Sequence, residues 1–323
     1  MDKCNWGIVG SGWIAHEMGE ALTKVNGEIY GVYDISADMA KKFAEEYAIQ
    51  QVFTSEKEFL EDKQIEIVYV ATPHNLHYEW MKKALLAGKH VFVEKVITVN
   101  NQQLEECIAI AEQQNLVIME GMTLYHMPLF SAVKERLQSG ELGKVKMVQV
   151  NFGSCKEYDV THRFFSKELA GGALLDIGVY AVSFARFFLA ETPNVVLSTV
   201  NYFETGVDEE AGILMKNALG QLVVIALTMR AKQAKRGTII AEKGYIEIEN
   251  YPRADQAKIV FTEDNRVEEI VLGHSGAALE YEVAAIQKYI TENKSNDTLA
   301  WSLDVNRLLT EIRNLWGFKY PFE

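Results

Sequence analysis

A glycine-rich turn near the N-terminus has the residue types and spacing of a phosphate-binding loop for a dinucleotide. The turn Gly10-Ser11-Gly12-Trp13-Ile14-Ala15 follows the apolar run Trp6–Val9 and leads into a helical pattern. Gly10 permits a tight turn out of the strand, Gly12 lets the backbone approach a pyrophosphate, and Ala15 lets the helix pack close to the strand. The free N–H groups and the positive dipole end of that helix then face the anion. The residues expected to bind the cofactor here are Gly10, Ser11, Gly12, Trp13 and Ile14.

An acidic residue follows at the distance that this kind of loop requires. The second apolar run, Ile29–Tyr33, ends in Asp34, about twenty residues beyond the loop. A carboxylate there accepts hydrogen bonds from both ribose hydroxyls and repels a 2′-phosphate. Asp34 therefore favours NAD, although Lys41 and Lys42 lie close enough in sequence to assist a phosphate, so NADP remains possible.

Strand-like and helical stretches alternate over the first part of the chain, which predicts a parallel sheet with right-handed crossovers. Ligands of such sheets bind outside the carboxyl ends of the strands. The residues that stand at the predicted strand ends are Gly10, Asp34, Thr72, Lys95 and Glu120. We expect them to line one crevice. Lys95, with Glu94 before it, is the residue there best suited to proton chemistry.

The pattern changes after residue 121. A helix at Leu129–Ser139 and a strand at Lys144–Phe152 precede a run of strand-like segments joined by turn signals, and two helices close the chain. The sequence therefore predicts an α/β protein with a Rossmann domain (1–121) and an α+β domain with a large, mostly antiparallel sheet (122–323). One face of that sheet remains to be buried, which predicts a homodimer or a higher homo-oligomer.

Composition narrows the class of protein. The chain has 323 residues and a net charge of −13, which argues against nucleic acid or an anionic membrane as a partner. No apolar run is long enough to be read as a membrane span. The first strand begins close to Met1, so no signal peptide is expected, and the three cysteines form no paired motif. We therefore expect a cytoplasmic protein with reduced thiols.

Two histidines at a predicted helix start, His74 and His77, have a spacing that a metal site could use. No third ligand stands at metal-site spacing, so we expect no metal.

Four motifs follow one another along the chain: Gly10-x-Gly12-x-x-Ala15, Ala71-Thr72-Pro73-His74-x-x-His77, Glu94-Lys95 and Gly171-Gly172-Ala173-Leu174-Leu175-Asp176-Ile177-Gly178-Val179-Tyr180. In this order and spacing they resemble the glucose-fructose oxidoreductase / inositol dehydrogenase / rhizopine catabolism (Gfo/Idh/MocA) family. The resemblance covers essentially the whole chain. The segment that ends in Tyr180 is similar to the branch that contains dimeric dihydrodiol dehydrogenase and xylose dehydrogenases.

The resemblance implies a role for each matched residue. Lys95 would stand near the nicotinamide and the reacting oxygen, Tyr180 would transfer the proton, and Asp176 would orient the substrate. The residues implied to line the cofactor are Thr72, Pro73, Asn75, His77, Glu94 and Lys95. The chain departs from the family pattern at Val96, where the family has proline, and it has no arginine beside Asp34, where NADP-using relatives carry one.

The implied reaction is hydride transfer between NAD(P) and the hydroxyl-bearing carbon of a neutral sugar, polyol or dihydrodiol. A free tyrosine, with a pKa near 10, is a poor base at neutral pH. An ammonium about 4 Å away stabilises a phenolate by roughly 4 kcal/mol at an effective dielectric of about 20, so Lys95 would support Tyr180. The residues expected to contact the substrate are Tyr158, Arg163, Phe164, Asp176 and Tyr180.

Two alternatives stay open at this point. The chain could be a dinucleotide-binding sensor or partner protein that has kept the fold without turnover, which the departure at Val96 favours. It could also be a nicotinamide enzyme of different chemistry, such as an imine or biliverdin-type reductase. Fold alone does not decide between them.

Overall fold

The computed structural model describes residues 4–25, 27–292, 294 and 296–323, which form two compact units. The first unit contains the chain as far as Gly121 together with Leu279–Ala300. The second contains Met122–Ala278 and Trp301–Glu323. The chain thus passes from the first unit to the second after residue 121, and it later returns to the first. The domain bounds predicted from the sequence, 1–121 and 122–323, do not include this return.

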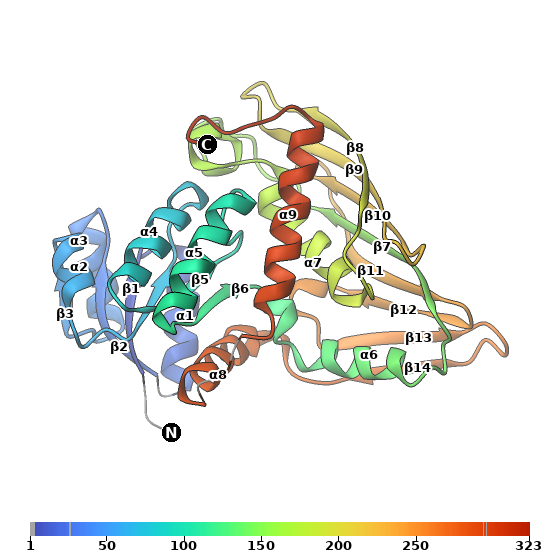
Figure 1. Cartoon of the computed structure of the whole chain (residues 1–323), viewed down its shortest axis with the longest axis horizontal. Coiled ribbons are helices and arrows are strands. Elements are labelled where there is room, and N and C mark those ends of the chain that lie inside the picture. Colours follow the sequence, from blue (N-terminus) through green and yellow to red (C-terminus); the bar gives the residue numbers. More distant parts are fainter. Residues whose placement is uncertain (1–3, 26, 293, 295) are drawn as a thin grey trace. The chain divides into compact units, whose positions relative to one another are not determined.

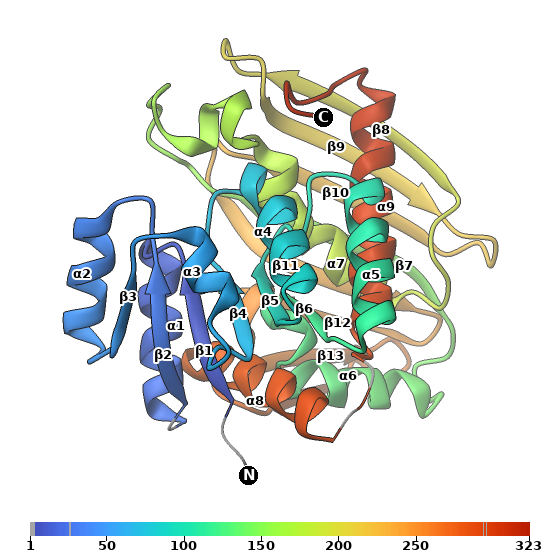
Figure 2. The same cartoon turned by 60° about the vertical axis from the view of Figure 1, so that its left-hand side comes forward.

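The first unit is the predicted parallel sheet with its helices (Figures 1 and 2). Its six strands have the order β3-β2-β1-β4-β5-β6, and every neighbouring pair is parallel, which confirms the Rossmann architecture. The strands are β1 (Asn5–Val9), β2 (Glu28–Tyr33), β3 (Gln51–Phe53), β4 (Ile67–Val70), β5 (His90–Glu94) and β6 (Ile118–Gly121). The helices are α1 (Trp13–Lys24), α2 (Ala37–Glu46), α3 (Glu56–Glu61), α4 (His74–Leu86), α5 (Asn101–Gln114) and α8 (Ala278–Thr291).

Short polar side chains begin several of these helices. Ser36 accepts a hydrogen bond from the Met39 N–H at the start of α2, and Asn100 accepts one from the Gln103 N–H at the start of α5. Each pairs a backbone donor that has no partner inside the helix. Helix α1 is different because its first position is preceded by Gly12, which offers no side chain for this purpose.

The second unit is built on an eight-stranded sheet of order β14-β13-β12-β11-β7-β10-β9-β8. All neighbours are antiparallel except β7 and β10, which are parallel, so the prediction of a mostly antiparallel sheet is confirmed. The strands are β7 (Val145–Gly153), β8 (Val195–Tyr202), β9 (Asp208–Lys216), β10 (Leu222–Thr228), β11 (Gln233–Ala241), β12 (Gly244–Glu249), β13 (Gln256–Phe261) and β14 (Val267–Val271). The helices are α6 (Pro128–Gln138), α7 (Val179–Phe188) and α9 (Leu299–Leu315), whose first two residues belong to the other unit.

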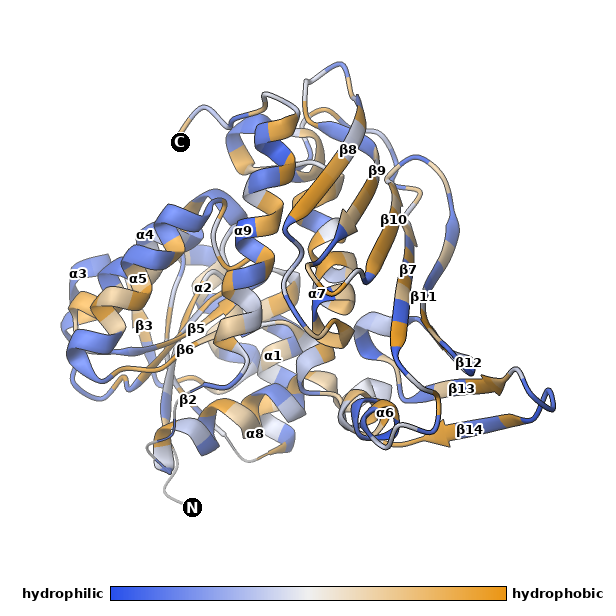
Figure 3. Ribbon diagram, turned by 45° about the vertical axis from the view of Figure 1, so that its right-hand side comes forward, coloured by the Kyte–Doolittle hydropathy of each residue, from blue (hydrophilic) through white to orange (hydrophobic). Residues whose placement is uncertain are grey.

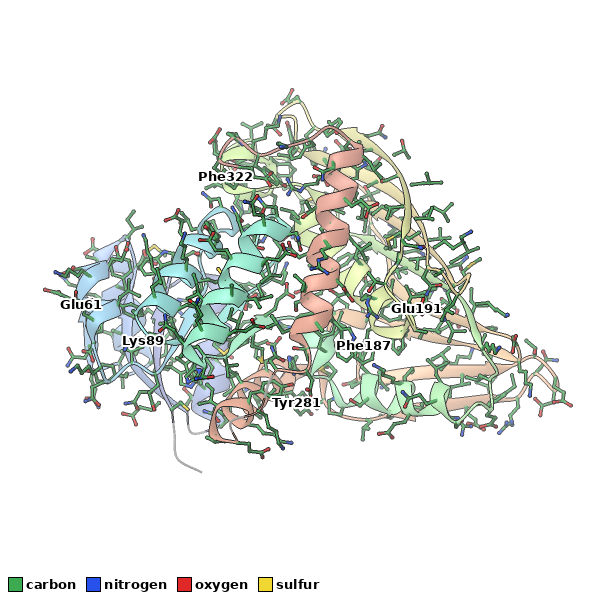
Figure 4. All side chains as sticks on the ribbon, viewed as in Figure 1. Glu61, Lys89, Phe187, Glu191, Tyr281 and Phe322 are labelled. Carbon is green, nitrogen blue, oxygen red and sulfur yellow. The ribbon has the colours of Figure 1, made fainter. Side chains whose placement is uncertain are left out.

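Helix α7 packs on β7, β10 and β11 and is the core helix of this unit. Phe187, labelled in Figure 4, has its ring 5.7 Å from that of Phe130 and 4.8 Å from that of Trp301. The helical stretch Lys167–Phe188 has the length and hydropathy of a membrane span, contrary to the expectation from the sequence, but 83% of its apolar window is buried inside the protein. Burial of this kind is what the core helix of a folded domain requires.

Part of the sheet surface remains apolar and exposed. Leu197 on β8 pairs with Leu214 on β9, and Leu214 pairs with Val224 on β10. These side chains are 59%, 42% and 38% exposed, and Figure 3 shows hydrophobic residues along all three strands. We call this set the apolar row.

Gly172 offers a direct test of the fold just before α7. Its φ is +115°, and a Cβ there would overlap the Asp208 carboxylate. Gly220 is a matched control, because its φ is +80° but a Cβ there would meet no atom within 4 Å. In thermal and urea unfolding, Gly220→Ala should cost about 1 kcal/mol for the left-handed backbone. Gly172→Ala should cost about 3 kcal/mol or more, because overpacking adds to strain. Equal losses would contradict this packing.

Candidate active site

The two glycines of the phosphate-binding turn have different structural roles. Gly10 has φ +86°, its N–H donates to the Tyr33 carbonyl at 2.9 Å, and a Cβ on it would lie 2.8 Å from the Ala71 carbonyl oxygen. Gly10 therefore lets the end of β1 pass close to the end of β4. A Cβ on Gly12, by contrast, would meet no atom within 4 Å. Gly12 faces open space, which is what a closely approaching ligand needs.

The start of α1 has the features of an anion site. The first turn of α1 has no acidic residue, and no side chain caps it. The N–H groups of Ala15 and His16 donate to the Gly12 carbonyl. The N–H groups before them, at the very start of the helix, have no partner within the helix. Trp13 is 74% exposed beside them. A phosphate would find backbone donors and the positive end of the helix dipole here.

Asp34 lies at the end of β2 and is joined to the same loop. Its Oδ2 accepts hydrogen bonds from the Ser11 N–H at 2.7 Å and from the Ser11 hydroxyl at 2.8 Å. Its Oδ1 accepts one from the Ser36 N–H at 2.8 Å. Because each carboxylate oxygen can accept more than one hydrogen bond, Asp34 keeps capacity for ribose hydroxyls. Ile35, next in sequence, is 96% exposed and provides no charge for a 2′-phosphate.

The turn between β4 and α4 contains Thr72, Pro73 and Asn75. The Thr72 Oγ1 and Asn75 Oδ1 atoms are buried and have no hydrogen-bond partner among the residues that the structure describes. Buried polar atoms nearly always have partners, so these two are available to a bound molecule. Together with the open space at Gly12, they show that the residues present fit a dinucleotide.

The segment that carries Lys95 is held by buried polar groups on either side of it. The Tyr69 hydroxyl donates to Glu94 Oε1 at 2.6 Å, and the Ile97 N–H donates to Glu120 Oε1 at 3.0 Å. Burial, followed by the charge of Glu94, raises the pKa of Tyr69 well above its usual value, so Tyr69 stays a donor. Lys95 itself is partly exposed at the carboxyl end of β5, as predicted.

His77 holds the next part of the same segment. Its Nδ1 lies 2.7 Å from the Val96 carbonyl oxygen, and its Nε2 lies 2.9 Å from the Thr72 carbonyl oxygen. The ring is fully buried, and the Lys95–Val96 peptide bond is cis. His77 therefore joins the backbone at Thr72 to the backbone at Val96. Its predicted contribution to cofactor binding would be to hold these two segments in place.

In the second unit, Asp176 and Tyr180 lie on one continuous helical segment that sequence reasoning treated as a plain helix. Leu174–Gly178 is a π-helical turn, and α7 begins directly after it. Such turns often occur at functional sites. The Leu174 N–H donates to Asp208 Oδ2 at 2.6 Å, and burial raises the pKa of Asp208 to about 6. Asp208 lies on a distant strand, so its hydrogen bond to this helical segment could not be predicted from the sequence.

Three of the residues predicted to contact the substrate are brought together. Arg163 lies 3.6 Å from Asp176 through a guanidinium nitrogen and a carboxylate oxygen, and its guanidinium stands 4.4 Å from the centre of the Phe164 ring. Asp176 is buried and Arg163 is partly exposed. Tyr158 has other partners: its hydroxyl donates to Glu204 at 2.8 Å, and its ring stacks on that of Phe203.

Residues that the sequence did not single out surround Tyr180. The Phe152 ring lies 6.1 Å from the rings of both Tyr180 and Tyr251. Lys235 Nζ stands 4.8 Å from the centre of the Phe152 ring. Phe152 is on β7 and Lys235 is on the neighbouring strand β11, within the short stretch where the register of this pair shifts.

Comparison with known proteins identifies the class. Residues 4–122 match the oxidoreductase family with an NAD-binding Rossmann fold, and residues 130–247 match the GFO/IDH/MocA C-terminal domain. The chain therefore belongs to the Gfo/Idh/MocA family and is an oxidoreductase that uses a nicotinamide cofactor.

Three similar proteins illustrate the range of this family. A trans-1,2-dihydrobenzene-1,2-diol dehydrogenase of Xenopus laevis is 28% identical over 98% of this chain and 99% of its own length. A scyllo-inositol 2-dehydrogenase (NADP(+)) of Bacillus subtilis is 28% identical over 97% of both chains. The structure of a levoglucosan dehydrogenase with NADH and levoglucosan superposes with a TM-score of 0.88 at 19% identity, covering 97% of this chain and 96% of that one. At 19% identity, the similarity to the levoglucosan dehydrogenase shows only that the two chains share a fold.

Gly12 gives a test of the cofactor site that does not disturb the fold. Because no protein atom lies near its Cβ direction, Gly12→Ala should melt within about 1 kcal/mol of the wild type. The added methyl should nevertheless obstruct the pyrophosphate and raise the Kd for NADH by at least about tenfold, or about 1.4 kcal/mol. Fluorescence titration of NADH measures this. An unchanged Kd in a folded variant would place the cofactor elsewhere.

Proposed function

We propose that this enzyme transfers a hydride between a nicotinamide cofactor and the hydroxyl-bearing carbon of a sugar, polyol or dihydrodiol. The observation that carries the proposal is the buried anchoring of Glu94 and Ile97, which fixes Lys95 at a strand end of the sheet that also presents Gly12. The names of the dihydrodiol and inositol dehydrogenases support the substrate class. When bound, the nicotinamide supplies the carbon that accepts or donates the hydride.

The chain's own residues have to orient the substrate and move one proton. In this proposal Tyr180 exchanges the proton of the substrate hydroxyl, and the Lys95 ammonium stabilises the negative charge that develops on oxygen. Asp176 and Arg163 bind further hydroxyl groups, and the Phe164 ring covers an apolar face of the substrate. The ion pair of Arg163 with Asp176 supports this part because it fixes both side chains before the substrate binds.

Substitution of the two proposed catalytic residues tests the mechanism. Tyr180→Phe and Lys95→Ala should each lower kcat by about 10²–10⁴-fold, the usual contribution of a proton-transferring group. NADH affinity should stay near that of the wild type, since neither side chain holds the phosphates. Tyr202→Phe is the matched control, because Tyr202 is an exposed phenol on β8. Near-full turnover by Tyr180→Phe would remove this residue from the mechanism.

A substrate survey separates the proposal from the alternatives. Wild-type enzyme is given NAD or NADP with aldoses, polyols and dihydrodiols, and reduced-cofactor absorbance is followed. Turnover of any hydroxyl substrate supports the dehydrogenase. Absence of turnover with every hydroxyl compound would contradict the proposal, and reduction confined to imines or biliverdin-like compounds would indicate the other nicotinamide chemistry.

We propose NAD as the preferred cofactor. The support is Asp34, whose carboxylate stands at the ribose position of such folds and whose neighbour Ile35 is exposed and uncharged. With any substrate that reacts, kcat/KM should be at least about tenfold higher with NAD than with NADP, which is about 1.4 kcal/mol. Asp34→Ser should reduce this ratio because it removes the repulsion of a 2′-phosphate. A wild-type enzyme that prefers NADP would contradict the assignment.

We propose that the enzyme is a homodimer formed through the apolar row. Its three exposed aliphatic side chains form a continuous cross-strand set on neighbouring strands, which a second copy can bury by symmetry. Sedimentation velocity should give a dimer for the wild type and a monomer for Leu214→Lys. Leu219→Lys is the control, because Leu219 is 62% exposed but lies in the turn beyond β9. A monomeric wild type would refute the proposal.

A further inference from the structure

Positive side chains gather near Lys235, which lies on β11 of the second unit. They come from different elements of the fold, and we call them the basic cluster: Lys156, Arg163, Lys232, Lys235 and Arg253. The chain as a whole carries a net charge of −13, so a local excess of positive charge is contrary to its general composition. A concentration of one sign of charge beside a reactive group is a means of recognising the opposite charge.

Lys235 is linked to the proposed proton-transferring residue through an aromatic ring. It lies on β11, with its ammonium 4.8 Å from the centre of the Phe152 ring, and that ring lies 6.1 Å from the ring of Tyr180. The Lys235 side chain is only partly exposed. It forms no ion pair with any residue in the described part of the chain.

Two further cations of the cluster lie over the ring of Phe164. Lys156 Nζ lies 4.1 Å from the centre of the Phe164 ring, and the Arg163 guanidinium lies 4.4 Å from it. Arg163 also reaches Asp176 at 3.6 Å, so this carboxylate offsets part of its charge. The aromatic rings of Phe152 and Phe164 thus each have ammonium or guanidinium groups over them, with Asp176 and Tyr180 on the same helical segment.

The cations act on one another. Burial lowers the pKa of Lys235, and the charges of Lys232, Lys156 and Arg253 lower it further. Asp176 opposes this shift but has the smallest influence of these groups. The protein therefore keeps an ammonium in a partly desolvated place where its neighbours repel it. A bound anion would offset both costs, since charge-assisted hydrogen bonds are strong where water is excluded.

We infer that the natural substrate carries an anionic group, a carboxylate or a phosphate, which Lys235 binds with Lys156 while Tyr180 acts on a hydroxyl elsewhere in the same molecule. This inference rests on the proposed function and replaces the expectation of a neutral substrate. The class is thus a sugar acid or sugar phosphate. Carboxylate and phosphate share the acceptor oxygens that these side chains recognise.

Matched substrate pairs test the inference. The pairs are D-glucose with D-glucuronate, D-galactose with D-galacturonate, and D-glucose with glucose 6-phosphate. For the wild type, kcat/KM should be at least about tenfold higher for the anionic member of a pair, and raising the ionic strength should diminish this difference. Preference for the uronates identifies a carboxylate, and preference for the 6-phosphate identifies a phosphate. Equal values within all pairs would overturn the inference and leave the dehydrogenase intact.

The variant Lys235→Gln locates the effect. It should lose most of the preference for the anionic member through a higher KM, with the neutral member little changed. Lys258→Gln is the control, because it removes one exposed lysine from β13 of the same sheet. A Lys235→Gln enzyme that keeps the full preference, or that loses activity equally on both members, would contradict the assignment.

Calorimetry distinguishes failure of this inference from failure of the proposed function. D-glucuronate, D-galacturonate and glucose 6-phosphate are titrated into the enzyme–NADH complex of the wild type and of Lys235→Gln. Binding that is lost in the variant supports the anionic site even if no hydroxyl substrate is turned over. Absence of binding by all of these anions would refute the site whatever the enzyme oxidises.

Discussion

The position of Lys95 depends on how the backbone around it is fixed. Glu94 and Glu120 are buried carboxylates, and each accepts a hydrogen bond that holds the segment Glu94–Ile97. Burying a carboxylate is costly unless it is hydrogen-bonded, and His77 adds a further link through the Val96 carbonyl. Hydrophobic packing alone would hold the strand but would not fix the direction of the residues just beyond it. Polar groups from β4, α4 and β6 therefore determine the backbone position of the proposed catalytic lysine.

The second unit uses the same physical device. Asp208 is buried, its pKa is raised to about 6 by that burial, and it accepts the Leu174 N–H at the start of the π-helical turn. Gly172 leaves room for this carboxylate. The turn carries Asp176, and Tyr180 follows in α7. In both units a buried acid fixes the backbone next to a proposed functional residue, which is a local cost in stability that gives precise positioning.

Sequence reasoning predicted the features that depend on neighbours along the chain. The tight turn at Gly10, the place of Asp34 after the second strand and the position of Lys95 at a strand end follow from local turn chemistry and from the alternation of strands and helices. The partners of His77, the role of Asp208 and the meeting of Phe152 with Lys235 depend on strand register and on which face of a sheet a side chain occupies. The return of Leu279–Ala300 to the first unit is likewise a tertiary feature, because helical periodicity does not state which sheet a helix covers.

The central proposal is that the Lys95 ammonium and the Tyr180 phenol act on one substrate oxygen beside the nicotinamide. A crystal structure of the enzyme with NADH and a bound substrate tests this most directly. The account predicts Lys95 Nζ and Tyr180 Oη each within about 3 Å of the reacting oxygen, with Gly12 against the pyrophosphate. A complex in which either atom lies out of hydrogen-bonding reach of that oxygen would contradict it.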